Sequence, residues 1–304
     1  LRCIEVPVDP VTFQIDVKAV QRAVTANTIA IVGSAVSFSQ GVMDDIPALA
    51  DIALKRGCGL HVDNCLGSLL LPFLPAAGYP VRPFDFRVPG VTSLSADTHK
   101  YGYAPKGSSV IMYANNTLRT YQYSVYPDWM GSIYATPGVA GSRPGALIAA
   151  TWGVMMYLGK EGYTSWATRI MQVVKEIEAG VEAIPELIIQ GSPASSVVCF
   201  STTPQSSLSI FNVSDALAKR GWELSLMQYP AGMHICVTQI HTHGDAATRL
   251  LQDLRAAIEH VRSAKPGEFK DGVGSIYGMA EQIPDRSMVN DIAVGYLDTL
   301  YTAQ

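Results

Sequence analysis

The first third of the chain alternates short apolar segments with amphipathic ones, and this alternation limits the possible folds more than any other feature. Residues 29–32 and 60–62 are short and apolar, as in strands that are buried on both faces of a sheet. Between them lie segments with helical periodicity. The expected order is a helix at 17–24, a strand at 28–34, a helix at 46–56 and a strand at 59–63. This order predicts an α/β fold with a mostly parallel central sheet covered by helices.

The rest of the chain continues this sheet and then changes pattern. Strands at 91–95 and 108–113 enclose a polar loop, and residues 117–145 are rich in Tyr, Gly, Ser and Pro, which predicts a long irregular stretch. Helices are expected at 146–158, 163–183, 213–219 and 245–262, and strands near 196–201, 223–227 and 234–240. We therefore predict a larger domain over residues 1–160 and a smaller α+β domain over residues 161–304.

Composition and charge exclude several classes of protein. The chain has 304 residues, of which 48% are apolar and 16% charged, so it can bury a sizeable core. Its net charge of -4 gives no electrostatic basis for binding nucleic acid. The five cysteines are an odd number without CxxC spacing, which argues against a disulfide framework or a zinc site. His241 and His243, expected on one side of a strand, lack a third ligand, so no metal is predicted.

A lysine in the polar loop between two apolar segments is the strongest chemical signal. Lys100 directly follows His99 in the run SADTHKYGYAPKGSS at 95–109. Such a lysine is typical of an enzyme that holds pyridoxal phosphate (PLP) through a Schiff base. PLP accepts electrons only while its ring nitrogen is protonated, which requires a carboxylate beside it. Asp63 ends an upstream strand and is placed for that role, since open α/β sheets bind ligands at the carboxyl ends of their strands.

Other polar residues near these strand ends are candidates for supporting roles. His99 either transfers protons and tunes the lysine, or only hydrogen-bonds phosphate or backbone. Ser34 either reaches the phenolic oxygen of PLP or stays a simple turn serine. Cys65 points to the same side as Asp63 and is expected to pack on the ring face. Asp97 is placed with the cofactor-binding residues.

Three residues in Gly/Pro-rich loops carry donors that suit a phosphate group. They are Lys106, Ser142 and Arg143. The alternative for the two cations is a solvated position on the surface, where lysine and arginine usually lie.

The motifs around these residues resemble those of the sphingosine-1-phosphate lyase family. The resemblance rests on the run at 95–109, LHVD at 60–63, PFDFR at 83–87, AGSRPG at 140–145 and GSIYGMA at 274–280. It implies PLP as cofactor, fold type I with a smaller α+β C-terminal domain, and an obligate homodimer with active sites at the subunit interface. The implied substrates are long-chain base phosphates.

The resemblance also implies a role for each candidate residue. Lys100 would carry the cofactor, with Asp63 on the pyridine nitrogen and Cys65 against the ring. The implied phosphate contacts are Lys106 and Ser142 on the substrate, and Gly131 and Ser132 on the cofactor from the partner subunit.

The implied reaction is a retro-aldol cleavage that gives a fatty aldehyde and phosphoethanolamine. His99 or a nearby tyrosine would move the proton, and the sequence does not choose between them. Two alternatives stay open: a PLP-dependent amino-acid decarboxylase of the same fold, and a non-catalytic dimerising or regulatory fragment.

Some family features differ in this sequence or lie outside it. Gln40 stands where several relatives carry histidine, and Asn64 stands where alanine is common. The family's membrane anchor, Gly-rich Thr-Glu-Ser turn and ring-stacking histidine are not among the 304 residues, so we expect the N-terminal part of the fold to be missing. The resemblance alone implies location at the endoplasmic reticulum membrane, with the catalytic domain facing the cytosol and membrane contact only through that missing part.

Overall fold

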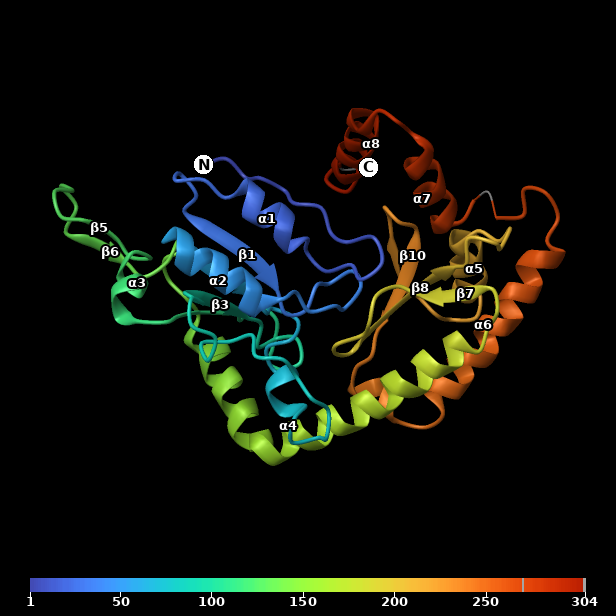
Figure 1. Ribbon diagram of the computed structural model, residues 1–304, viewed down its shortest axis with the longest axis horizontal. Coiled ribbons are helices and arrows are strands. Elements are labelled where there is room, and N and C mark those ends of the chain that lie inside the picture. Colours follow the sequence, from blue (N-terminus) through green and yellow to red (C-terminus); the bar gives the residue numbers. More distant parts are fainter. Residues whose placement is uncertain (270, 303–304) are drawn as a thin grey trace. The chain divides into compact units, whose positions relative to one another are not determined.

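The chain forms two compact units in the computed structural model, which describes residues 1–269 and 271–302 (Figure 1). The first unit comprises Leu1–Lys175, Gly191–Val197 and Val237–His243, and the second comprises Glu176–Gln190, Val198–Cys236 and Gly244–Gln304. The chain therefore passes between the units more than once. The predicted domain boundary at residue 160 stays a prediction.

A four-stranded sheet is the framework of the first unit. Its order is β1 (Ala30–Ser34), β2 (Gly59–Asp63), β3 (Ser93–Ala96) and β4 (Val110–Tyr113). The first three strands run parallel, and β4 pairs antiparallel with β3. The mostly parallel sheet predicted from the sequence is confirmed.

Helix α1 (Val17–Ala23) precedes β1 in the chain, and helix α2 (Ile46–Arg56) follows it. Helix α2 packs against one face of the sheet. It begins at Asp45, whose carboxylate accepts a hydrogen bond from the first turn, and it ends at Gly57 in the left-handed conformation. Gly33 in β1 permits the close approach of α2, because a Cβ there would lie 2.6 Å from the Leu49 side chain. Both helices match their predicted positions.

The opposite face of β1 differs from expectation. The strand alternates between exposed and buried residues, and the side chain of Val32 is 57% exposed. We expected strands buried on both faces. Within the part of the chain that the structure describes, β1 is buried on one face only.

The stretch predicted to be irregular contains regular elements. Helix α3 (Asn116–Thr120) is followed by a two-stranded hairpin of β5 (Ser124–Tyr126) and β6 (Tyr134–Thr136), which projects beyond α3 in Figure 1. Strands β5 and β6 have only three residues each, too few for an alternation of apolar and polar side chains to predict them. Most residues of the hairpin are exposed.

Helix α4 (Gly145–Glu182) contains the two helices predicted at 146–158 and 163–183. Gly159 has φ 56° and ψ -173°, so a kink separates two helical segments at that position. The hydroxyl of Tyr163, just after the kink, donates a hydrogen bond of 2.9 Å to the carbonyl of Gly102 in the lysine loop. The helix thereby holds the loop that follows Lys100.

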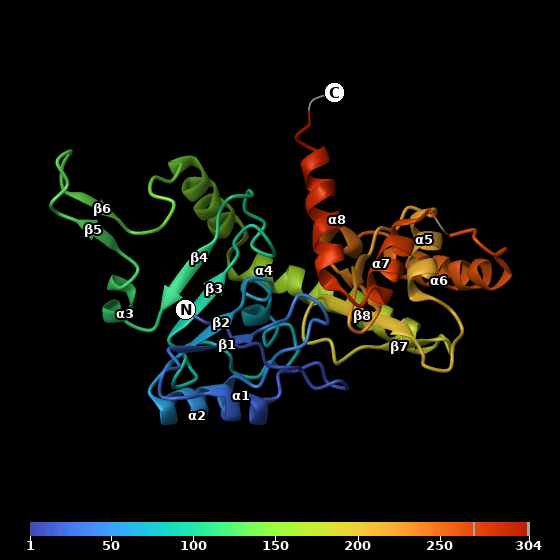
Figure 2. The same cartoon turned by 90° about the horizontal axis from the view of Figure 1, so that it is seen from above.

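The second unit is the predicted α+β arrangement. Its sheet, of which Figure 2 labels β7 and β8, has the order β7 (Leu187–Ile189), β8 (Val197–Thr202), β10 (Gly232–Cys236) and β9 (Ser225–Met227), with β7–β8 and β9–β10 antiparallel. Its helices are α5 (Ile210–Ala218), α6 (Ala246–Ser263), α7 (Val273–Gln282) and α8 (Arg286–Thr299).

The two histidines near residue 242 do not lie on a strand as expected. Strand β10 ends at Cys236, and a short 3-10 helix at Gln239–Thr242 contains His241. The Nδ1 atom of His241 accepts a hydrogen bond of 2.9 Å from the backbone N–H of Thr238, so the imidazole caps this turn. Among the described residues, no group of three His, Cys, Asp or Glu side chains is arranged to hold a metal ion.

Among the helices of the described residues, none combines the length and the apolar character that a membrane span requires.

The lysine loop offers a direct test of this fold. A Cβ on Gly102 would lie 2.3 Å from the carbonyl oxygen of Thr98. We expect Gly102→Ala to destabilise the protein by about 1–3 kcal/mol, because backbone atoms must move to admit the methyl group. Urea unfolding of the intact protein measures this change in free energy.

Gly153 provides the matched control. It lies within α4, and a Cβ there would meet nothing within 4 Å. Gly153→Ala should leave stability unchanged or raise it by about 0.5–1 kcal/mol. Equal destabilisation by both variants would contradict the tight packing of the lysine loop.

Candidate active site

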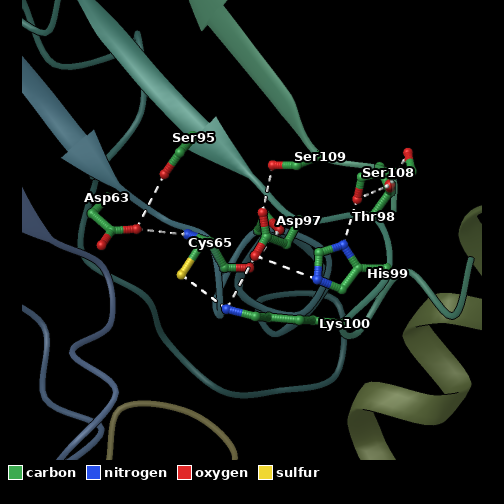
Figure 3. Close-up of polar contacts among 10 residues, drawn as sticks. Asp63, Cys65, Ser95, Asp97, Thr98, His99, Lys100, Ser108 and Ser109 are labelled. Atoms are coloured by element: carbon green, nitrogen blue, oxygen red, sulfur yellow. Dashed lines mark hydrogen bonds and ion pairs between the residues drawn. The ribbon is translucent and has the colours of Figure 1, made fainter. Parts of the chain in front are cut away.

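Asp63 lies at the carboxyl end of β2, where β3 also ends (Figure 3). Its Oδ1 accepts two hydrogen bonds of 3.1 Å, one from the Ser95 hydroxyl and one from the Cys65 backbone N–H. Ser95 also accepts a hydrogen bond from the Asn64 backbone N–H at 3.2 Å. Because both bonds to Asp63 fall on Oδ1, its Oδ2 keeps acceptor capacity for a ligand N–H.

Lys100 lies between a thiol and a carboxylate. Its Nζ is 3.1 Å from Cys65 Sγ and 3.1 Å from Asp97 Oδ2. Dashed lines mark both contacts in Figure 3. Burial disfavours the charged amine, but the hydrogen bonds and the charges of Cys65 and Asp97 outweigh burial and raise the pKa of Lys100. Burial also raises the pKa of the Cys65 thiol, with Asp63 adding to the effect. Without a ligand, Lys100 is therefore held as an ammonium ion.

Asp97 connects Lys100 with the next strand. The Ser109 hydroxyl donates a hydrogen bond of 2.6 Å to Asp97 Oδ1, and His99 Nε2 lies 3.8 Å from Asp97 Oδ2. Burial acts to raise the pKa of Asp97, but the hydrogen bonds from Ser109 and Lys100 prevail and lower it. Asp97 is thus a carboxylate that faces both the lysine and the imidazole.

His99 is oriented by the start of the next segment. Its Nδ1 lies within hydrogen-bond distance of the Ser108 carbonyl oxygen, which can only accept. Nδ1 therefore carries a hydrogen, and Nε2 is the nitrogen that faces Asp97. The Ser108 hydroxyl is also hydrogen-bonded to Thr98 at 2.7 Å, so the loop is tied on both sides of His99.

His61 shares a sheet face with Asp63 but has a different partner. Its Nδ1 is 2.8 Å from the Ser93 hydroxyl, and burial lowers its pKa. The neutral imidazole is thus a hydrogen-bonded member of the sheet.

Ser34 lies in register with Asp63 on the neighbouring strand β1. Its backbone N–H donates a hydrogen bond of 2.7 Å to Asp44 Oδ2, and Asp44 Oδ1 accepts another of 2.8 Å from Ile15. Burial raises the pKa of Asp44. The sequence did not predict a role for Asp44, whose carboxylate holds the end of β1 through its hydrogen bond with Ser34. A contact of Ser34 with the phenolic oxygen of PLP stays a prediction.

The residues predicted to bind phosphate groups all lie on the surface. They are Lys106, Gly131, Ser132, Ser142 and Arg143. The structure describes no hydrogen bond or ion pair from any of them to the group around Lys100. Their roles therefore stay predictions.

The two positions that differ from the family pattern are both buried. Asn64 is 2% exposed, and its Oδ1 has no hydrogen-bond partner in the described structure. Gln40 is 9% exposed and accepts a hydrogen bond from the neighbouring Ser39 hydroxyl. Asn64 follows Asp63 in the chain, and its Oδ1 lies against Gly67, where an added Cβ would be only 2.6 Å away.

The donor set fits PLP. An amine that can form a covalent bond with an aldehyde lies beside a strand-end carboxylate with one open oxygen, and a half-buried thiol lies between them. The two groups that PLP chemistry requires, lysine and carboxylate, come from adjacent parallel strands. No metal is needed to explain this arrangement.

Comparison with known families identifies the class of protein. Residues 1–203 match the model of the pyridoxal-dependent decarboxylase conserved domain, so the chain belongs to this family of PLP-dependent proteins. Within it, the chain is similar to sphingosine-1-phosphate lyases. It is 44% identical to that of Drosophila melanogaster over 97% of this chain and 54% of the relative, and 43% identical to that of Mus musculus over 95% and 50%. The chain thus spans about half the length of the curated relatives it matches.

Solved structures agree with this assignment. The sphingosine-1-phosphate lyase of Burkholderia pseudomallei has a TM-score of 0.81 and 46% identity, over 84% of this chain and 58% of that protein. The glutamate decarboxylase of Lactobacillus brevis has a TM-score of 0.73 at 20% identity, over 86% of this chain and 61% of that one, which shows the fold alone. Fold type I, the PLP cofactor and the family resemblance are confirmed.

The ion pair at the lysine predicts a change in amine reactivity. Asp97→Asn removes the negative charge that favours the ammonium form, so the pKa of Lys100 should fall. At a fixed pH near neutrality, Lys100 in the cofactor-free protein should then react several-fold faster with an acylating reagent. Mass spectrometry of the Lys100 peptide measures this rate.

Asp85→Asn is the control, because Asp85 pairs with Arg87 and with no lysine among the described residues. It should leave the reactivity of Lys100 unchanged. An unchanged rate of Lys100 acylation in Asp97→Asn would contradict the conclusion that Asp97 raises the pKa of Lys100.

Proposed function

We propose that this protein is a PLP-dependent lyase that cleaves sphingosine 1-phosphate and related long-chain base phosphates to a fatty aldehyde and phosphoethanolamine. The observation that carries the proposal is the placement of Lys100, Cys65 and Asp63 at adjacent strand ends. Identities of 43–46% to several proteins named sphingosine-1-phosphate lyase support the substrate class.

Bound PLP would supply an electron sink for breaking a carbon–carbon bond. Lys100 would hold the cofactor and release it to the substrate amine. Asp63 Oδ2, which keeps acceptor capacity, would accept the pyridine N–H and favour the charged form of that nitrogen. Cys65, in contact with Lys100 Nζ, would line the cofactor site.

Proton transfer falls to the groups around Asp97. His99 carries a hydrogen on Nδ1, which leaves Nε2 to exchange a proton beside Asp97. While Lys100 carries no cofactor, its ion pair with Asp97 stabilises the protonated amine. The residue that deprotonates the substrate hydroxyl is His99 or a tyrosine, as the sequence predicts.

The phosphate groups would be bound by surface loops. Lys106 and Ser142, with Arg143 beside them, are proposed to bind the substrate phosphate, and Gly131 and Ser132 to approach the cofactor phosphate of the partner subunit. All five are exposed, which leaves their donors available to a ligand or to a second copy of the chain.

We also propose a homodimer that forms through the hairpin β5–β6 and the first part of α4. Trp152 is 67% exposed, Tyr157 89%, Met130 101% and Ile133 70%. Large apolar side chains with such high exposure are common at protein interfaces, which supports the proposal. Gly131 and Ser132 lie within the same hairpin turn, which agrees with a contribution to the site of the partner.

Location at the endoplasmic reticulum membrane, with the catalytic part facing the cytosol, is proposed on the resemblance to the lyase family. Fractionation of cells that express the intact protein tests this location.

Product analysis tests the proposed reaction. Incubation of the intact protein with sphingosine 1-phosphate should give phosphoethanolamine and a fatty aldehyde in equal amounts, and Lys100→Ala should abolish both products. Release of carbon dioxide from an amino acid would favour the decarboxylase instead. Absence of a visible absorbance band after addition of PLP would leave the non-catalytic alternative.

Lys106→Ala examines the substrate phosphate in the same assay. Loss of a charge-assisted hydrogen bond should raise KM for the substrate about 10-fold or more and leave the affinity for PLP unchanged. Lys55→Ala, which alters an exposed lysine on α2, is the matched control. Equal weakening of substrate and PLP would show that Lys106 has another role.

The proposed dimer predicts the effect of a charge at its centre. Trp152→Asp should weaken self-association about 30-fold or more, because a charged group replaces an aromatic side chain that the proposed dimer would bury. Leu54→Asp, which changes a 56% exposed side chain on α2, should leave self-association unchanged. Sedimentation velocity over a range of protein concentrations measures both. An unchanged dimer in Trp152→Asp would exclude this surface.

A further inference from the structure

The contact between Cys65 and Lys100 joins a thiol and an amine that come from different parts of the chain. Cys65 follows β2, Lys100 follows β3, and Nζ lies 3.1 Å from Sγ. We propose that these two residues form a peroxide-sensitive pair, in which a covalent sulfur–nitrogen bond closes the cofactor site. The proposal rests on the role proposed above for Lys100 as the lysine that binds PLP.

Both residues are held in place by the backbone around them. The Cys65 N–H is hydrogen-bonded to the Asp63 carboxylate, and the Lys100 N–H to the Asp97 carbonyl at 3.2 Å. The two side-chain atoms therefore need only a small further approach to form a bond. The amine side chain is 30% exposed and Cys65 is half-buried, so a molecule as small as hydrogen peroxide can reach the pair.

The chemistry balances with hydrogen peroxide as the only oxidant. The thiol is oxidised by two electrons: one peroxide oxygen bonds to sulfur to give a sulfenic acid, and the other leaves as water. The neutral amine of Lys100 then attacks the sulfur. The nitrogen–sulfur bond forms, the sulfur–oxygen bond breaks, and hydroxide leaves with a proton from nitrogen as a second water. A thiol reductant in two equivalents reverses the bond and becomes a disulfide.

Two other cysteines lack this arrangement. Cys199 is fully buried, and its thiol donates a hydrogen bond of 3.3 Å to Gln190 Oε1. Burial raises the pKa of this thiol to about 12. Cys58 is half-buried, and the described structure places no amine against it. Cys65 is distinguished from both by the lysine beside it.

The charged groups around the pair set its pH dependence. Asp97 and the nearby His99 face the amine, and Asp63 faces the thiol. Both partners are in their protonated forms near neutral pH, since the pKa of Lys100 and the pKa of Cys65 are both raised. Thiolate and neutral amine become more abundant as pH rises, so bond formation should accelerate towards alkaline pH.

Mass spectrometry of the intact protein tests the proposal. After removal of PLP, the protein is treated with hydrogen peroxide at graded pH and digested with trypsin. The peptides of Cys65 and Lys100 should appear linked, lighter than their sum by two hydrogen atoms, with cleavage after Lys100 lost. A thiol reductant should restore both peptides and the capacity to bind PLP.

Matched variants identify the atoms involved. Cys65→Ser should remove the linked species, whereas Cys58→Ser should retain it. Prior loading with PLP should protect the pair, because the lysine nitrogen is then occupied. Oxygen added to Cys65 with Lys100 left unmodified would overturn the proposal. Linkage without protection by PLP would leave the sulfur–nitrogen bond established and would instead refute the cofactor role of Lys100.

Discussion

Parallel pairing of β2 with β3 is the constraint on which the candidate site depends. His61 is in register with Ser93 and Val62 with Leu94, so both strands end at the same edge of the sheet. Asp63 and the loop that bears Lys100 therefore meet there, although they are distant in the chain. The Ser95 hydroxyl crosses from β3 to the Asp63 carboxylate and fixes that meeting at the level of side chains. A shift of one residue in register would turn Asp63 to the other face and separate the acid from the amine.

The loop that carries Lys100 is fixed by buried tyrosines. Tyr101 is 5% exposed and donates a hydrogen bond of 2.8 Å to the Val237 carbonyl, and Tyr163 is 4% exposed and donates one to Gly102. Burial raises the pKa of Tyr103 to about 12, so this hydroxyl keeps its proton at physiological pH. The backbone that follows Lys100 is thus fixed, so the amine can change position only through rotation of the Lys100 side chain. A site built in this way presents the same nitrogen to each incoming cofactor or substrate.

Opposing effects act on the ionisable groups of the site. Burial disfavours the charged forms of both Lys100 and Asp97, yet their contact of 3.1 Å raises the pKa of the first and lowers that of the second. The resting pair is an ammonium and a carboxylate. If Lys100 carries the cofactor as proposed, attachment would break this pair, and Asp97 would then govern the availability of the amine.

The sequence by itself determined the candidate chemistry. A His-Lys pair in a polar loop and an aspartate at a strand end marked Lys100 and Asp63 as the candidate amine and acid, because open α/β sheets bind ligands at the carboxyl ends of their strands. It also determined the parallel sheet, helix α2, whose caps at Asp45 and Gly57 are local signals, and the two helical segments on either side of Gly159. It did not reveal the hairpin β5–β6 or the placement of His241 as a cap, since short strands and turns depend on contacts distant in sequence.

Only the tertiary structure decided which side chains share a proton or a charge. The contact of Lys100 with Cys65, and the hydrogen bond from Ser34 at the end of β1 to Asp44, come from three-dimensional proximity between different segments of the chain. Periodicity fixes which face of a strand a side chain occupies, but the distance between two side chains is set by the packing of the whole unit. For that reason, Lys100, Cys65 and Asp97 could be chosen as candidates from the sequence, but the contacts among their side chains could not.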